Sequence, residues 1–138
     1  MRILAVDPGS KHIGLAISDT TATIANPLAV LNHVARPVDA AAVADLAKTN
    51  NAALIVVGQS LDDDGNPTFE GRRAKRFVAA LKTQSDIPVV FWDESFTTLE
   101  AREARVAMGV SRKNRRGHLD SIAATVLLQS YLDANPQK

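Results

Sequence analysis

The sequence predicts an α/β fold, with a mixed five-stranded sheet covered by helices on both faces. Strand-like stretches come first along the chain, and helix-like and strand-like stretches then alternate, an order that favours this class of fold. The 138 residues are 46% hydrophobic and show no compositional break, which is enough apolar material for one real core. We therefore expect a single domain that spans residues 1–138.

The first strands are expected close to the N-terminus. Residues 3–6 form a short apolar run that ends on Asp7 and turn-forming residues, as a central strand does. Residues 12–18 alternate between large apolar and small side chains, which predicts a hairpin with the first strand. A third strand is expected at residues 26–31, with Pro27 at an edge or boundary.

The middle of the chain alternates between helix and strand. A helix is predicted from Val38 to about residue 51, because apolar residues recur there at helical spacing. Residues 53–57 then form an apolar strand. A second helix is predicted over residues 69–82, with a strongly basic outer face. The strand at residues 87–92 runs directly into two acids.

The C-terminal third contains two predicted helices and a basic connection. Residues 97–109 have a helical pattern with Gly109 as the stop. Residues 111–117 contain no apolar side chain, which predicts a basic loop. Residues 119–132 are apolar around most of the helical circumference, so this helix is expected to be largely buried.

Composition excludes several classes of protein. The chain has no Cys, which removes disulfides, thiolate zinc sites and cysteine nucleophiles, and is typical of a reducing compartment. The N-terminus does not resemble a signal peptide, and no apolar stretch approaches the roughly 18 residues of a membrane helix. We therefore expect a soluble, cytoplasmic protein. The net charge of +1 is not that of a general nucleic-acid binder, although local basic clusters can still attract a polyanion.

Three acids lie at the ends of predicted elements and are the candidate catalytic residues. Asp7 ends one strand, Glu94 follows another, and Asp120 starts the last helix on the same stripe as Ala124 and Leu127. Ligand sites of open α/β sheets lie at the carboxyl ends of strands. Three inward carboxylates would repel one another without cations, and oxygen ligands without Cys suit Mg²⁺ or Mn²⁺. Such a metal site is suited to phosphodiester hydrolysis.

Each acid also has a structural alternative. Asp7 is a common first residue of a turn, Glu94 could pair with an Arg, and Asp120 is a plausible helix N-cap. The roles of two neighbours stay open. Asp93 is either a polar strand end or a partner of the metal site, and His118 is either a surface residue or a proton relay.

Basic side chains form two clusters that could hold a nucleic-acid backbone. The alternative for each cluster is a solvated surface, and the basic loop is the stronger candidate because it lies next to Asp120. Lys11, in the first turn, is a further candidate. The predicted nucleic-acid-binding residues are Lys11, Arg72, Arg73, Arg76, Arg112, Lys113, Arg115 and Arg116.

Four segments together resemble the RuvX/YqgF family, bacterial RNase H-like proteins that are similar to the Holliday-junction resolvase RuvC. They are DPGSKHIGLAISD at 7–19, VG with DDDG within 57–65, DESFTTLEA at 93–101 and LDSIAATVLLQSYL at 119–132. The resemblance implies a ribonuclease H-like fold and divalent-metal hydrolysis of phosphodiesters. It also implies maturation of the 5′ end of 16S rRNA, with the family's acids at Asp7, Glu94 and Asp120.

Several functions compete. The leading interpretation is a metal-dependent nuclease, with Mg²⁺ or Mn²⁺, that acts on pre-rRNA as a monomer or weak homodimer. A resolvase of branched DNA is the alternative enzyme, and it normally needs two active sites and hence a dimer. A relative of actin-like ATPases would use the DPGS turn for phosphate, but 138 residues are too few for the two domains that usually enclose ATP. A non-catalytic RNA-binding module would use only the basic residues.

Overall fold

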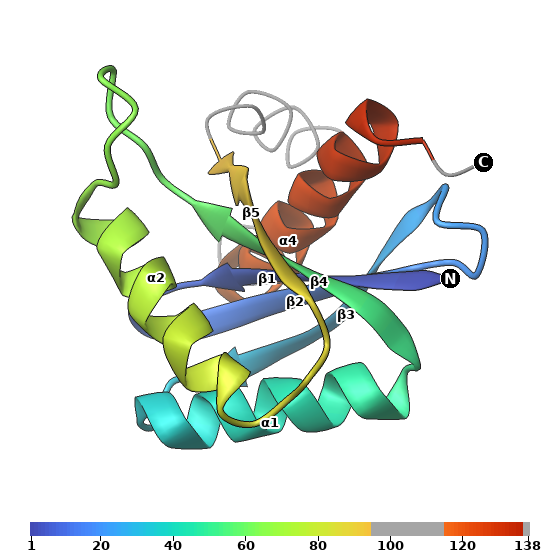
Figure 1. The fold of residues 1–138 in the computed structure, drawn as a ribbon, viewed down its shortest axis with the longest axis horizontal. Coiled ribbons are helices and arrows are strands. Elements are labelled where there is room, and N and C mark those ends of the chain that lie inside the picture. Colours follow the sequence, from blue (N-terminus) through green and yellow to red (C-terminus); the bar gives the residue numbers. More distant parts are fainter. Residues whose placement is uncertain (95–114, 137–138) are drawn as a thin grey trace.

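The computed structural model describes residues 1–94 and 115–136, with only the backbone for residues 115–120. This part of the chain forms five strands and three helices, whose arrangement Figure 1 shows. In chain order they are β1 (Arg2–Pro8), β2 (His12–Ser18), β3 (Ala25–Asn32), α1 (Arg36–Thr49), β4 (Ala52–Gln59), α2 (Phe69–Lys82), β5 (Val89–Asp93) and α4 (Arg115–Ala134).

The five strands form one mixed sheet in the order β3-β2-β1-β4-β5. β1 pairs antiparallel with β2 and parallel with β4, and β5 adds in parallel on the far side of β4. Pro27 lies on the edge strand β3, opposite Ala16, where the pairing register shifts, so the missing N–H of proline is tolerated. Because β1, β4 and β5 run parallel, their carboxyl ends lie at the same edge of the sheet.

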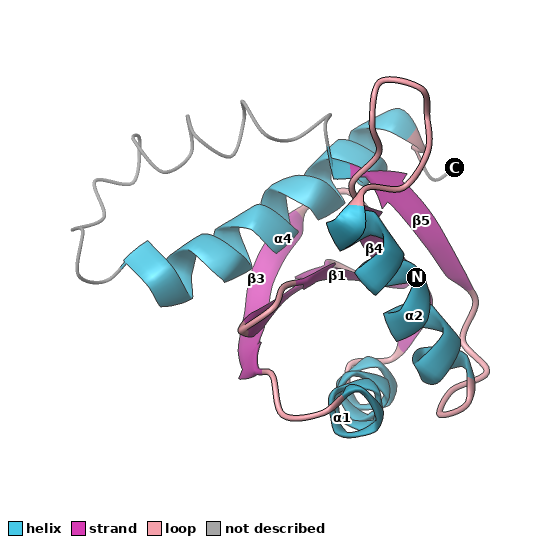
Figure 2. Ribbon diagram, turned by 90° about the vertical axis from the view of Figure 1, so that its left-hand side faces the viewer, coloured by secondary structure: helices cyan, strands magenta, loops and turns pink. Residues whose placement is uncertain are grey.

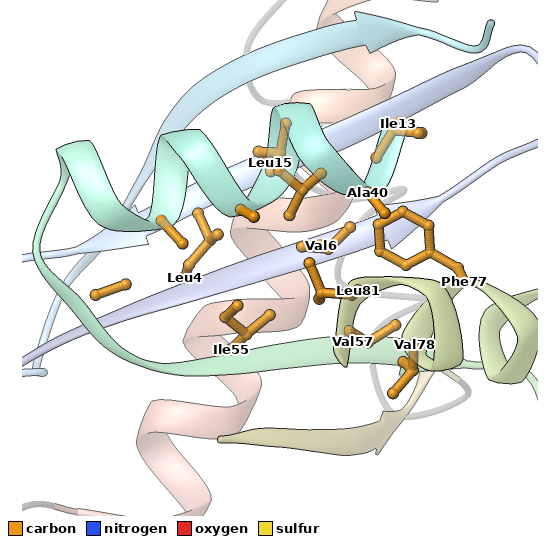
Figure 3. Close-up of a cluster of buried hydrophobic side chains, with 14 of the residues drawn as sticks. Leu4, Val6, Ile13, Leu15, Ala40, Ile55, Val57, Phe77, Val78 and Leu81 are labelled. Atoms are coloured by element: carbon orange, nitrogen blue, oxygen red, sulfur yellow. The ribbon is translucent and has the colours of Figure 1, made fainter. Parts of the chain in front are cut away.

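Helices cover both faces of the sheet, as the sequence predicts. Figure 2 shows α4 on one side and α1 with α2 on the other. Alternation along β1 divides its side chains between the two sides: Leu4 and Val6 join the core under α1 and α2, whereas Ile3 and Ala5 join the core under α4. Figure 3 shows the first of these cores, in which Phe77 of α2 packs with strand residues.

The predicted elements agree with the described structure, with one correction at the last helix. The predicted bounds of β2 and α2 match those observed, and the strand expected at 87–92 is present as β5. The prediction that residues 111–117 form a loop is wrong for residues 115–117, because α4 already begins at Arg115. Residues 111–114 and the helix predicted at 97–109 lie outside the described residues.

None of the helices in the described part of the chain has both the length and the apolar character required to cross a bilayer.

Candidate active site at the carboxyl edge of the sheet

The carboxyl ends of β1, β4 and β5 bring together residues that lie far apart in the sequence. Gly58 of β4 is opposite Trp92 of β5, and β5 ends at Asp93 immediately before Glu94. β1 ends at Asp7 and Pro8 next to β4. Asp7 follows Ile3 and Ala5 at alternate positions, which places it on the α4 side of the sheet.

The carboxyl groups of Asp7 and Glu94 are hydrogen-bonded to each other. Burial raises the pKa of Glu94 to about 9, and the hydrogen bond with Asp7 and the negative charges of Asp7, Asp93 and Glu70 act in the same direction. In the absence of a cation, Glu94 therefore keeps a proton near neutral pH and can share it with Asp7. Two oxygen ligands held this close are suited to bind a hard divalent cation, which would replace that proton.

Gly58 leaves the space that Glu94 occupies. A Cβ atom added to Gly58 would lie 2.7 Å from Oε1 of Glu94 and 3.0 Å from Cδ2 of Leu127 in α4. Both distances are too short for an unstrained contact, so any larger residue must displace the carboxyl group or the helix. The sequence shows Gly58 only as a strand end, and its contact with Glu94 depends on the pairing of β4 with β5.

α4 fixes the end of β5 that leads into Glu94. The indole Nε1 of Trp92 donates a hydrogen bond to Oγ of Ser130 at 3.1 Å. The ring of Trp92 also meets Tyr131 edge to face, with centroids 5.3 Å apart. These contacts hold the backbone immediately before Glu94 against a rigid element.

Asp19, another acid that follows a strand, has the opposite electrostatic environment. The Thr21 hydroxyl and the backbone N–H groups of Thr23 and Ile24 donate hydrogen bonds to its carboxylate. These hydrogen bonds lower the pKa of Asp19 to about 2. Asp19 is therefore a turn-stabilising carboxylate, whereas Glu94 is buried beside Asp7 and has a raised pKa.

Asp120 belongs to α4, five residues after the helix begins at Arg115, so the alternative that it caps the helix is wrong. Its side chain, like that of His118, is outside the described part of the structure. Within the described residues, no group of three or more acidic or histidine side chains forms a ready metal site. The two described members of the predicted triad, Asp7 and Glu94, are in contact.

The predicted basic residues of α2 divide between two environments. Arg73 and Arg76 line a cavity beside the turn after Asp7. Arg72 instead donates a hydrogen bond from its guanidinium to the carbonyl of Pro67. Lys11 is exposed in the β1–β2 turn. Arg112 and Lys113 lie outside the described residues, as do the side chains of Arg115 and Arg116.

Comparison with known proteins identifies the family. Residues 1–134 match the RuvX family, described as "Holliday junction resolvase". The chain belongs to the RuvX family. A relative from Syntrophus aciditrophicus (strain SB), named "Putative pre-16S rRNA nuclease", is 38% identical over 138 residues, which cover 100% of this chain and 92% of the relative. A protein of the same name from Caldanaerobacter subterraneus subsp. tengcongensis is 37% identical, with 97% of each chain covered.

Solved structures confirm the RuvC-like, RNase H-like fold of this RuvX chain. The structure titled "T. thermophilus RuvC in complex with Holliday junction substrate" aligns with a TM-score of 0.61 at 17% identity, covering 100% of this chain and 98% of the other. The fowlpox virus resolvase in its complex with Holliday junction DNA aligns with a TM-score of 0.59 at 18% identity, with 99% and 100% covered. At these identities, the likeness concerns the fold alone.

Proposed function

We propose that this RuvX chain is a nuclease that requires a divalent metal and hydrolyses phosphodiester bonds in structured nucleic acid, with the 5′ end of pre-16S rRNA as its substrate. The observation that carries this proposal is the Asp7–Glu94 pair, in which the pKa of Glu94 is raised to about 9 at the carboxyl edge of the sheet. A buried pair of acids is energetically unfavourable, so its presence indicates a bound cation or a catalytic role.

The choice of pre-rRNA rests on the relatives. Chains that share 37–38% of their residues with this one over nearly their whole length carry the name of a pre-16S rRNA nuclease. The resolvases, by contrast, share only 17–18% of their residues and the fold. The chemistry is the same for both substrates, because each reaction hydrolyses a phosphodiester.

In this proposal Asp7, Glu94 and Asp120 hold Mg²⁺ or Mn²⁺. When bound there, the metal would supply activation of a water and stabilisation of the charge on the phosphate. Glu94 must lose its proton before it can act as a ligand, and Gly58 keeps the space that its carboxylate needs. The predicted basic residues hold the phosphate backbone that the carboxylates would otherwise repel.

Resolution of branched DNA is the second candidate, because the family description and the RuvC-like fold both point to it. Two cuts across a junction need two active sites, so this function requires a dimer. Purified protein should be assayed on a 16S precursor and on a four-way junction, with metal and with EDTA, and its mass in solution measured. If a dimer cleaved only the junction, branched DNA would replace pre-rRNA as the proposed substrate.

Asp7→Asn should abolish cleavage while leaving the fold intact. The substitution removes a metal ligand and one negative charge beside the buried Glu94, and the Asn amide can still hydrogen-bond the protonated Glu94, so thermal stability without metal should stay the same or rise. Activity and circular dichroism of the purified variant check both expectations. A folded variant that cuts at the wild-type rate would show that Asp7 is not in the active site.

A further inference from the structure

A half-open cavity of about 440 Å³ lies beside the turn that follows Asp7. The β1–β2 turn, the segment before α1, the start of α1 and the middle of α2 all contribute to its wall. Its polar lining residues are Ser10, His33, Arg36, Asp39, Arg73 and Arg76. Its apolar part includes Ile13 and Phe77, both buried in the core under α1 and α2.

The cavity and the acid pair lie on opposite sides of the sheet at the same edge. Glu94 packs against Gly58 near Leu127 of α4, on the α4 side. Ile13 and Phe77 belong to the core on the other side, under α1 and α2. The β1–β2 turn follows Asp7 and also lines the cavity, and Gly9 keeps this turn compact because a Cβ there would lie 2.4 Å from the carbonyl oxygen of His12. A phosphate in the cavity is therefore a different phosphate from one at the acid pair.

The cavity has a net positive charge from its described lining residues, three arginines and one aspartate. Arg36, Arg73 and Arg76 make no ion pair with any residue in the described part of the chain. The guanidinium of Arg73 lies over the ring of Phe69, 5.4 Å from its centroid, which restricts its motion without neutralising it. Three guanidiniums facing one space are suited to bind phosphate oxygens.

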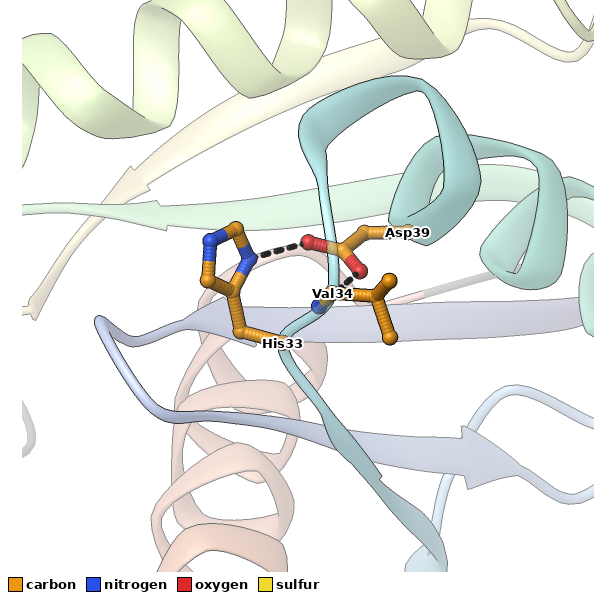
Figure 4. Close-up of polar contacts among 3 residues, drawn as sticks. All are labelled: His33, Val34 and Asp39. Carbon is orange, nitrogen blue, oxygen red and sulfur yellow. Dashed lines mark hydrogen bonds and ion pairs between the residues drawn. The ribbon is translucent and has the colours of Figure 1, made fainter.

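His33 is held in a fixed orientation at this cavity. Its Nδ1 is 2.5 Å from Oδ2 of Asp39, which is only 4% exposed, and the other oxygen of Asp39 accepts the backbone N–H of Val34 at 3.0 Å. Asp39 is the only carboxylate that the described residues place in the wall, and both its oxygens are occupied by these contacts. Figure 4 shows the second ring nitrogen of His33, Nε2, facing away from Asp39. Nε2 is thus free of the contact that orients the ring.

We propose that this cavity is a second phosphate-binding site, which takes a phosphate of the nucleic-acid strand away from the scissile bond. Arg36, Arg73 and Arg76 bind its oxygens, and His33, oriented by Asp39, contacts it through Nε2. The inference rests on the proposed function for the identity of the strand. The cavity would then fix the register of the substrate as it passes over the β1–β2 turn to the acid pair.

Binding without cleavage tests this site independently of catalysis. Inorganic phosphate, titrated in EDTA and followed by ¹H–¹⁵N NMR, should shift the amides of Gly9 and Ser10 and the Nε2 signal of His33 in a saturable manner. A purely structural His33–Asp39 pair would leave the Nε2 signal unchanged. Non-saturable shifts spread over all basic residues would overturn the site.

Matched variants separate the cavity from general charge. In EDTA, Arg76→Gln should weaken binding of a single-stranded RNA about tenfold, as expected for a lost charged hydrogen bond, whereas Lys75→Gln should change it much less. Lys75 is exposed on the same helix and does not line the cavity. Equal losses in the two variants would overturn the proposal.

Two further results distinguish the sources of the phosphate. Inorganic phosphate should compete with RNA at the cavity, and His33→Gln should weaken both ligands. If phosphate binds there and RNA does not displace it, the site serves free phosphate and the assignment to the strand is wrong. If RNA binds as proposed but no cleavage occurs with metal, the nuclease proposal fails and the binding site stands.

Discussion

At the scale of single residues, the candidate site differs from ordinary strand ends by its electrostatics. Asp19 and Glu94 both follow strands, yet hydrogen bonds lower the pKa of Asp19 to about 2, and burial next to Asp7 raises the pKa of Glu94 to about 9. The sequence pattern is the same in both places. The pairing of β4 with β5 decides that Glu94, and not Asp19, is buried next to another acid.

The raised pKa of Glu94 predicts a pH dependence of stability in the absence of metal. Its ordinary pKa is 4.5, so between about pH 4.5 and 9 the folded state holds a proton that the unfolded state has lost. The stability from this group is thus complete below pH 4.5 and is lost as the pH rises towards 9. Glu94→Gln should flatten this part of the curve in urea denaturation, whereas Asp63→Asn, in an exposed turn, should not. Parallel curves for Glu94→Gln and wild type would contradict the shift.

Gly58→Ala should move the carboxyl group of Glu94. The new Cβ would lie 2.7 Å from Oε1 of Glu94 and 3.0 Å from Leu127, so overpacking should cost about 1–3 kcal/mol of stability. Metal-dependent cleavage should fall as well. Gly65→Ala is a matched control, because Gly65 has a φ of +83° but nothing within 4 Å of an added Cβ. It should lose stability from backbone strain and keep activity, and equal losses of activity would contradict the role of Gly58.

At the scale of elements, periodic sequence patterns predict the features that depend on local sequence, such as the bounds of helices and strands. The bounds of β2 and α2 follow from strict alternation and from apolar residues at helical spacing. The helix α4 starts at Arg115, earlier than the sequence predicts, because residues 111–117 contain no apolar side chain that could reveal a helical period. The contact of Gly58 with Glu94 and the cavity at His33 join separate elements, so no local pattern could indicate them.

The basic segment before and at the start of α4 gives a prediction at this scale. Replacement of Arg112, Lys113, Arg115 and Arg116 together by Ala should reduce the slope of log affinity against log salt by roughly 3, or somewhat more on a duplex. Alanine preserves helix propensity where α4 begins. Removal of Lys48 and Lys82, in the last turns of α1 and α2, is the control and should alter the slope little. An unchanged slope in the folded quadruple variant would exclude this segment from the substrate path.

At the scale of the whole molecule, the sheet separates the two proposed sites. The acid pair lies on the α4 side, and the arginines of the cavity lie on the side of α1 and α2. This separation keeps the guanidiniums from pairing with the carboxylates. A nucleic-acid strand that crosses this edge of the sheet would meet the arginines of the cavity on one side and the proposed metal on the other. The two different contacts would fix the 5′-to-3′ direction in which the strand binds.

Metal binding should stabilise the whole fold, because a cation that binds only the folded state raises the free energy of unfolding by mass action. At a concentration about 100 times the Kd, this gain is about 2.7 kcal/mol. Near neutral pH, binding should also release about one proton, since Glu94 is protonated without metal and must ionise to become a ligand. Titration calorimetry with Mn²⁺ in two buffers of different ionisation enthalpy counts this proton. Asp7→Asn should lose both the thermal shift and the proton release, and a wild-type protein that shows neither effect would not contain the proposed metal site.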